Sequence, residues 1–171
     1  MFMRRLLHAL VFLGLATLST ACDEHDHGAF DLDHVCGDLR RATPQNLDAG
    51  ASADAANLPS LASEHQPYTL SLPTTDTGTR RGFARIAQSA RSGVGFFVEQ
   101  DEATLIVRDE AGAQIFPSYS SRDTASCDRI AYLLIFDLAL GTYTLEFAGP
   151  AALTSVTVLV ERGAVADIPS N

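Results

Sequence analysis

Apolar and polar residues alternate along much of the second half of this chain. Four segments show the alternation most clearly: residues 68–72, 94–98, 143–147 and 156–160. Because side chains of a β-strand point to opposite faces in turn, each apolar set predicts a strand with one buried face. Denser apolar runs at residues 104–108 and 130–138 predict central strands covered on both faces, and residues 83–87 and 114–116 are weaker strand candidates.

Turn-forming residues separate these segments. They lie at residues 109–112, 139–141 and 149–150, each of which contains glycine. Glycine and acidic residues favour tight turns because they accept backbone angles that other residues resist. Seven to eight short strands with regular turns predict an all-β fold, an antiparallel β-sandwich.

Two of these segments resemble a known family. The hairpin Leu138-Ala139-Leu140-Gly141-Thr142-Tyr143-Thr144-Leu145 resembles the L-x-x-G-x-Y-x-L hairpin of bacterial pre-peptidase C-terminal domains, and residues 104–112 are similar to the L-x-L-x-D-x-x-G strand and turn of that family. The resemblance implies a small jelly-roll-like sandwich of the kind appended to secreted enzymes. It brings no catalytic residue onto this chain. The whole layout also resembles uncharacterised bacterial lipoproteins that begin with a His/Asp-rich segment.

The first residues have the layout of a bacterial lipoprotein signal. Arg4 and Arg5 precede an apolar run at residues 6–18, and small residues then lead to Cys22. The run is shorter than the ~20 residues that a membrane-spanning helix needs. We therefore expect cleavage of a signal peptide, residues 1–21, lipidation of Cys22 and a membrane anchor made by that lipid. Simple cleavage that leaves a free N-terminal Cys22 is the alternative, and the sequence leaves open which membrane of the cell envelope holds the anchor.

Lipidation of Cys22 would leave Cys36 and Cys127 as an even pair. An oxidising compartment would join them in a disulfide, and closing so long a loop is worth roughly 4–5 kcal/mol in the chain-entropy model. Two buried thiols, or Cys36 acting as a metal ligand, are the alternatives.

The rest of the chain divides by composition into four parts. Residues 22–41 are acidic and carry histidines, and we interpret them as a flexible tether. Residues 42–66 are rich in alanine, serine and aspartate and have too little apolar surface to pack alone, so they read as a low-complexity linker with an edge strand near residues 45–49. The sandwich domain spans residues 67–162, and residues 163–171 form a C-terminal tail.

Charge and motifs exclude some classes of function. The net charge is −9, which disfavours a nucleic-acid partner because such proteins need a basic surface. The sequence contains no nucleophile elbow, phosphate-binding loop or zinc-protease motif, so we expect no enzyme. A non-catalytic binding or structural module on a lipid anchor is the favoured interpretation, with a protein or glycan ligand left open.

One cluster of residues suggests a second function. His25, His27 and His34 lie among several aspartates near the start of the mature chain. Imidazole groups suit Zn²⁺ or Cu²⁺, and flanking carboxylates add ligands and charge. The favoured interpretation is a solvated, charged tether without a cofactor. The alternative is a periplasmic metal-binding protein that uses this N-terminal segment.

Overall fold

The computed structural model describes residues 30–122, 127–167 and 169. The expected signal peptide, the lipidation site Cys22 and the expected ligands His25 and His27 lie outside the described residues. Within the described part of the chain, no helix is long and apolar enough to cross a membrane.

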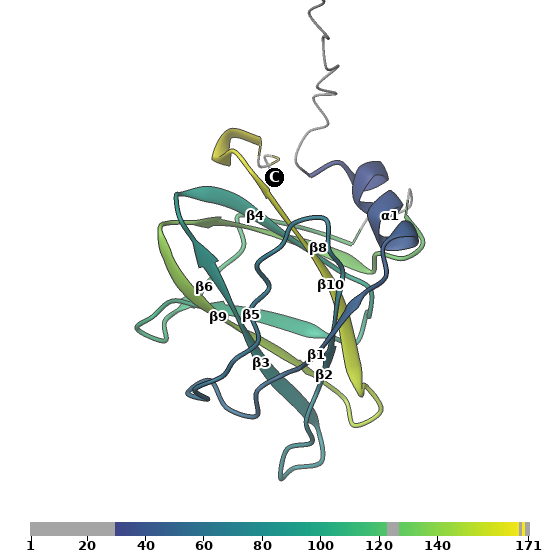
Figure 1. Cartoon of the computed structure of the whole chain (residues 1–171), viewed down its shortest axis with the longest axis vertical. Coiled ribbons are helices and arrows are strands. Elements are labelled where there is room, and N and C mark those ends of the chain that lie inside the picture. Colours follow the sequence, from purple (N-terminus) through teal and green to yellow (C-terminus); the bar gives the residue numbers. More distant parts are fainter. Residues whose placement is uncertain (1–29, 123–126, 168, 170–171) are drawn as a thin grey trace, which may run out of the picture.

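Two β-sheets face each other in a sandwich (Figure 1). The first sheet, sheet A, has the strand order β1 (Gln45–Asp48), β2 (Tyr68–Ser71), β10 (Ser155–Gly163), β4 (Ser92–Val98), β8 (Tyr132–Leu138) and β7 (Tyr119–Ser121). Sheet B has the order β3 (Arg80–Gln88), β9 (Gly141–Gly149), β5 (Thr104–Arg108) and β6 (Gln114–Ile115). One helix, α1 (Leu32–Arg41), lies against sheet A, and a short 3-10 helix (Val165–Asp167) follows β10.

The predicted β-sandwich is confirmed, with two differences in its strands. The described residues form ten strands instead of seven to eight. The additional strand β7 lacks apolar alternation and is held by pairing with β8. The sandwich is also not wholly antiparallel, because β1 pairs with β2 in parallel.

The main core lies between the two sheets and uses the alternating apolar sets. Phe96 and Val158 of sheet A and Leu145 and Phe147 of sheet B are all fully buried in one cluster. Strands β4, β8 and β10 are buried on both faces, because α1 covers the outer face of sheet A. Strand β5 was expected to be covered on both faces, but Ile106 on its outer side is only half-buried, since no helix among the described residues covers sheet B.

The flexible tether expected through Arg41 is instead helical in its second half. Asp31 caps α1 by accepting a hydrogen bond from the backbone N–H of Asp33 (2.9 Å). Val35 and Leu39, at i and i+4, are fully buried against the outer face of sheet A. The apolar stripe of α1 is short, but it packs against apolar side chains on the outer face of sheet A, and this contact is enough to hold the helix in place.

The predicted disulfide between Cys36 and Cys127 is confirmed, with an S–S distance of 2.09 Å. It joins the buried side of α1 to the segment before β8. Two arginines tie the same pieces together: Arg129 donates to the carbonyl of Leu39, and Arg40 pairs with Asp128 at 2.7 Å. The helix is therefore fixed to the sandwich by covalent, apolar and polar contacts.

Residues 42–66, expected as a linker, run along one edge of the sandwich. The edge strand expected near residues 45–49 is present as β1. Beyond it, Gly50 and Phe83 exchange backbone hydrogen bonds of 2.8 and 2.9 Å, and Leu61 N–H donates to the carbonyl of Arg85 (3.0 Å). Leu58 and Leu61 are buried. The segment cannot pack alone, but it packs here because the edge strand β3 offers unpaired backbone groups.

Candidate metal centre

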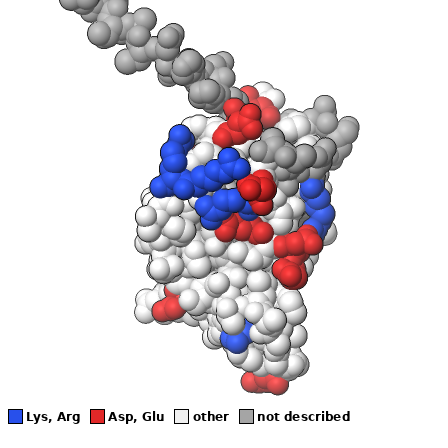
Figure 2. Space-filling model, turned by 90° about the vertical axis from the view of Figure 1, so that its right-hand side faces the viewer, with Lys and Arg blue, Asp and Glu red and all other residues white. Residues whose placement is uncertain are grey.

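Two histidines and two carboxylates converge where α1 meets the end of β10. His34 and Asp38 come from α1, His65 comes from the segment before β2, and Glu161 comes from β10. The cluster lies beside the apolar contact between α1 and sheet A. Figure 2 shows that charged side chains of both signs are interleaved at the height of α1, while the lower part of that face is largely uncharged.

The helix α1 sets the first half of the cluster. His34 and Asp38 are four residues apart, so their side chains are neighbours on one helix face. His34 Nε2 lies 3.4 Å from Asp38 Oδ2. The other oxygen, Oδ1, lies 3.5 Å from a guanidinium nitrogen of Arg41. The two carboxylate oxygens of Asp38 thus have different neighbours: Oδ1 lies near Arg41, and Oδ2 lies near His34 and His65.

His65 is held in a rare backbone conformation. Its φ is 57°, in the left-handed region that residues other than glycine seldom occupy. The chain on both sides is fixed: the Tyr68 hydroxyl accepts from the N–H of Ser63 (2.8 Å), and the Gln66 amide donates to the carbonyl of Thr43 (2.9 Å). These contacts maintain the strained conformation and direct the imidazole toward Asp38 and Glu161.

Glu161 forms the buried floor of the cluster. It shares the outer face of β10 with Leu159, and only 2% of its surface is exposed. Burial raises the pKa of its carboxyl group to about 7, an effect that nearby His65 opposes and that Asp38 and Glu64 reinforce. Glu64 lies close by as well, but it pairs with Arg162 at 3.2 Å. Glu161 is therefore the carboxylate that faces His65 without a guanidinium partner among the described residues.

The distances among His34, Asp38 and His65 match those between the ligand atoms of a small metal ion, and Glu161 lies close to His65. His65 Nδ1 lies 3.2 Å from Asp38 Oδ2, 3.3 Å from His34 Nε2 and 3.0 Å from Glu161 Oε1. Zinc binds nitrogen and oxygen ligands at about 2.0–2.1 Å, so the ligand atoms of a tetrahedral site are about 3.3 Å apart. His34, Asp38 and His65 thus form one triangular face of such a tetrahedron, and Glu161 lies beside it.

Hydrogen bonding alone leaves this cluster incompletely satisfied. His65 Nδ1 carries at most one proton, yet three electron-rich atoms lie within 3.3 Å of it. Glu161 Oε1 is buried and accepts no aligned hydrogen bond from any described residue, although Nδ1 is 3.0 Å away. A buried carboxylate oxygen without a donor is costly, and a cation at the centre would remove that cost.

The sequence analysis placed one of these four residues among the metal ligands. His34 was expected to act with His25 and His27, which lie outside the described residues; within the described part of the chain His34 lies beside Asp38 and His65, and His65 in turn contacts Glu161. The three additional residues were missed because their proximity depends on the docking of α1. One signal was present: Leu159, in the otherwise polar set of β10, indicates that this face of the sheet is covered.

Comparison with known proteins assigns this chain to no family. No protein-family model matches the chain, and a search of curated proteins found no similar sequence.

Proposed function

We propose that this protein binds one divalent transition-metal ion, with Zn²⁺ preferred, through His34, Asp38, His65 and Glu161. The observation that carries the proposal is the buried Glu161 carboxylate, which lies 3.0 Å from the His65 imidazole and has no arginine partner among the described residues. Its role is that of a non-catalytic module of the cell envelope.

The donor set supports this choice of ion. Imidazole nitrogen with carboxylate oxygen suits Zn²⁺, Cu²⁺ or Ni²⁺, whereas Ca²⁺ and Mg²⁺ prefer sites made of oxygen alone. His34, Asp38 and His65 supply three donors, and a movement of Glu161 toward them would supply a fourth, which would fill a tetrahedral shell and leave no position for a substrate. Structural zinc sites are closed in this way, and catalytic sites keep a position open. The arrangement therefore favours binding over catalysis.

Local charge supports a divalent ion. Asp38 and Glu161 together contribute two negative charges when both are ionised, and the histidines do not compensate them when neutral. Arg41 approaches only Asp38, at 3.5 Å, and Arg162 is engaged by Glu64. A divalent cation bound between the carboxylates would make the site neutral and would also replace the proton that Glu161 holds near neutral pH.

We further propose that the protein is exported, lipid-anchored through Cys22, and related in fold to the jelly-roll-like pre-peptidase C-terminal domains. From β2 to β10 the chain crosses repeatedly between sheet A and sheet B, with the pairs β5–β6 and β7–β8 each staying within one sheet, and frequent crossing of this kind is found in jelly-roll-like sandwiches. The Cys36–Cys127 disulfide is of the kind that persists in oxidising compartments. Substitution of Cys22→Ala should abolish lipid labelling and release the protein from the membrane fraction. Unchanged labelling would refute the anchor.

Calorimetric titration of the purified protein with Zn²⁺ tests the metal site. We expect binding of one ion per chain, and a loss of affinity of more than about 100-fold in the His65→Ala and Asp38→Asn variants. Two matched controls separate this site from its neighbours. Glu64→Gln removes a nearby carboxylate already paired with Arg162, and the double variant His25→Ala, His27→Ala removes the histidines of the N-terminal segment. Both controls should bind Zn²⁺ as the parent does.

Each other outcome contradicts the proposal. Binding that survives His65→Ala but is lost in the His25, His27 double variant would assign the metal to the N-terminal segment. Absence of Zn²⁺, Cu²⁺ and Ni²⁺ binding by the parent protein would show that the cluster is a hydrogen-bonded group with a purely structural role.

A further inference from the structure

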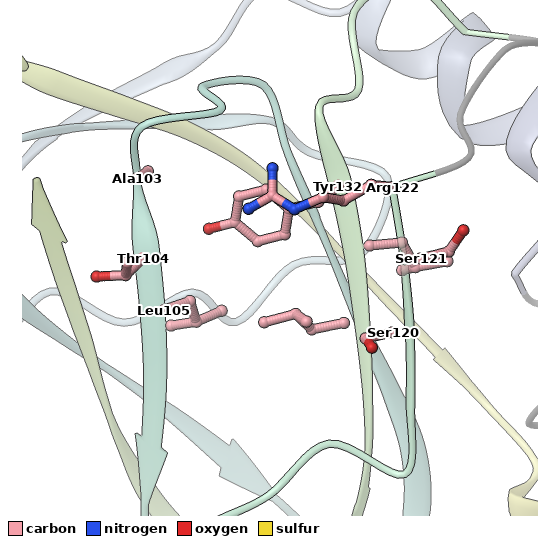
Figure 3. Close-up of a pocket in the computed structure, with 9 residues that line it drawn as sticks. Ala103, Thr104, Leu105, Ser120, Ser121, Arg122 and Tyr132 are labelled. Carbon is pink, nitrogen blue, oxygen red and sulfur yellow. The ribbon is translucent and has the colours of Figure 1, made fainter. Parts of the chain in front are cut away.

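A cavity of about 350 Å³ opens at the edge of the sandwich opposite residues 42–66, away from the metal centre. It lies between β5 of sheet B and the strands β7 and β8 of sheet A (Figure 3). At the other edge, residues 42–66 close the gap between the sheets, whereas here the gap is open. Leu105 of β5 and Leu134 of β8 form apolar walls on the two sides of the cavity, and Thr104 and Ser120 add hydroxyl groups.

The cavity contains a buried hydroxyl group without a partner. Tyr132 is 5% exposed, and its hydroxyl makes no hydrogen bond within the described part of the chain. Figure 3 shows this hydroxyl directed from β8 toward β5, across the cavity. Burial raises the pKa of the phenol, so Tyr132 stays protonated and offers a hydrogen-bond donor. Unpartnered buried donors are uncommon in native proteins, and a ligand that accepts a hydrogen bond would satisfy this one.

A cation lies over the aromatic ring that carries that hydroxyl. The guanidinium of Arg122 sits 5.2 Å from the centre of the Tyr132 ring. Arg122 also pairs with Asp101, but both side chains are more than half exposed, and exposed pairs are weak. The planar guanidinium has further N–H groups that can bind a carboxylate. One end of the cavity therefore offers a neutral donor and a positive charge, and the other end is apolar.

We propose that this cavity binds a small monocarboxylate with an aliphatic or aromatic body. The carboxylate would accept hydrogen bonds from the Tyr132 hydroxyl and the Arg122 guanidinium, and the body would lie between Leu105 and Leu134. An amine would be repelled by Arg122, and a neutral alcohol would gain no ionic contact. The volume holds about ten non-hydrogen atoms at the ~30 Å³ that one water occupies, which is the size of an eight-carbon fatty acid.

Titration with octanoate, 1-octanol and octylamine, followed by calorimetry, tests the proposal on the whole protein. The three probes share one alkyl chain and differ in the head group. We expect octanoate to bind one molecule per chain, the alcohol to bind at least about tenfold more weakly, and the amine to show no binding. Tyr132→Phe and Arg122→Gln should each weaken octanoate binding by at least about tenfold.

Two control variants make the result specific. Tyr143→Phe also removes a largely buried hydroxyl, but that hydroxyl donates to the carbonyl of Ala139 (3.0 Å) and does not line this cavity, so octanoate affinity should be unchanged. His65→Ala should also leave octanoate affinity unchanged, which separates this site from the metal centre. Because the Tyr132 hydroxyl has no partner among the residues that the structure describes, Tyr132→Phe should keep or raise the melting temperature of the empty protein.

Three results would overturn the proposal. Equal affinity for octanoate and 1-octanol would show a non-selective apolar gap. An unchanged octanoate affinity in Tyr132→Phe would show that the hydroxyl does not contact the ligand. Absence of octanoate binding by the parent protein, up to the solubility of the probe, would remove the site altogether.

Discussion

Two glutamates lie on the outer faces of opposite sheets, and their surroundings differ. Glu146, on β9 of sheet B, sits between Arg81 and Arg108, whose guanidinium nitrogens approach it to 4.0 and 3.4 Å. Glu161, on β10 of sheet A, is almost fully buried under α1 and faces His65 and Asp38. Both carboxylates are only slightly accessible to water, with side-chain exposures of 14% and 3%.

The difference lies in how each carboxylate is compensated. On sheet B, the guanidinium groups of Arg81 and Arg108 compensate the charge of Glu146, so this carboxylate needs no added ion. Sheet A uses an imidazole, which is a cation only when it is protonated, and leaves Glu161 Oε1 without an aligned donor among the described residues. A buried polar group without a partner requires an explanation, and a bound ion is one. The comparison therefore separates a structural charge ladder from the candidate metal centre.

Of the changes considered, removal of the disulfide should alter the surroundings of Glu161 most strongly, because it would release α1 from sheet A. The bridge closes a separation of 91 residues. The double variant Cys36→Ala, Cys127→Ala should lose about 4–5 kcal/mol of unfolding free energy, measured by urea denaturation. Zn²⁺ affinity should fall by at least about tenfold, because α1 supplies His34 and Asp38.

A matched control removes a polar contact between the same two segments. Arg40→Gln deletes the exposed pair with Asp128 and should change neither quantity appreciably. If the cysteine variant keeps both its unfolding free energy and its Zn²⁺ affinity, the apolar contacts of Val35 and Leu39 alone hold the helix, and the disulfide has no part in the site.

Most of the strands could be predicted from sequence because each carries its own apolar pattern; β7, which has none, could not. Strand β5 begins and ends where the dense apolar run of residues 104–108 does. The helix α1 was not predicted because only Val35, Cys36 and Leu39 of its ten residues are buried, and the aspartates around them resemble a solvated tether. A helix this short becomes stable through tertiary packing, which local pattern does not report.

The candidate metal centre could be predicted only in part, for the same reason. The i, i+4 spacing of His34 and Asp38 becomes meaningful once the segment is known to be helical. The proximity of His65 to Glu161 depends on the path of residues 42–66 along the sandwich and on the pairing of β10 with β2. These are long-range relations, and no local sequence pattern encodes them.

Neutralising each glutamate in turn sharpens the comparison at the level of single residues. Glu161→Gln should lower Zn²⁺ affinity by more than about 100-fold, whereas Glu146→Gln should leave it unchanged. For the free energy of unfolding, the two variants should rank in the opposite order. Glu146→Gln should cost about 1 kcal/mol of unfolding free energy because Arg81 and Arg108 lose their carboxylate. Glu161→Gln should leave the metal-free protein at pH 8 as stable as the parent or more stable, since it removes an uncompensated buried charge.

Calorimetric titration and urea denaturation measure the two effects independently. Equal losses of Zn²⁺ affinity in both variants would show that general electrostatics, and not coordination by Glu161, controls binding. A marked loss of stability in metal-free Glu161→Gln would show that the carboxylate is already well compensated by His65, and the distinction between the two faces would disappear.

The pH dependence of the metal-free protein provides the smallest and most direct test. The folded state raises the pKa of Glu161 from 4.5 to about 7, so folding favours the protonated form. Between these values the folded state binds more protons than the unfolded state, and stability must fall as pH rises. With a chelator present, the unfolding free energy should decrease by about 1–3 kcal/mol between pH 5 and 8.

The carboxyl groups of Asp128 and Asp137, whose pKa values are lowered from 3.8 by arginines, titrate below this window. Zn²⁺ should reverse the trend, because the ion replaces the proton and binds more tightly as pH rises. The Glu161→Gln variant should show a flatter profile with the chelator, since the residue responsible no longer ionises. If the parent and Glu161→Gln proteins follow the same profile, the titration belongs to other groups, and Glu161 is no more exceptional than Glu146.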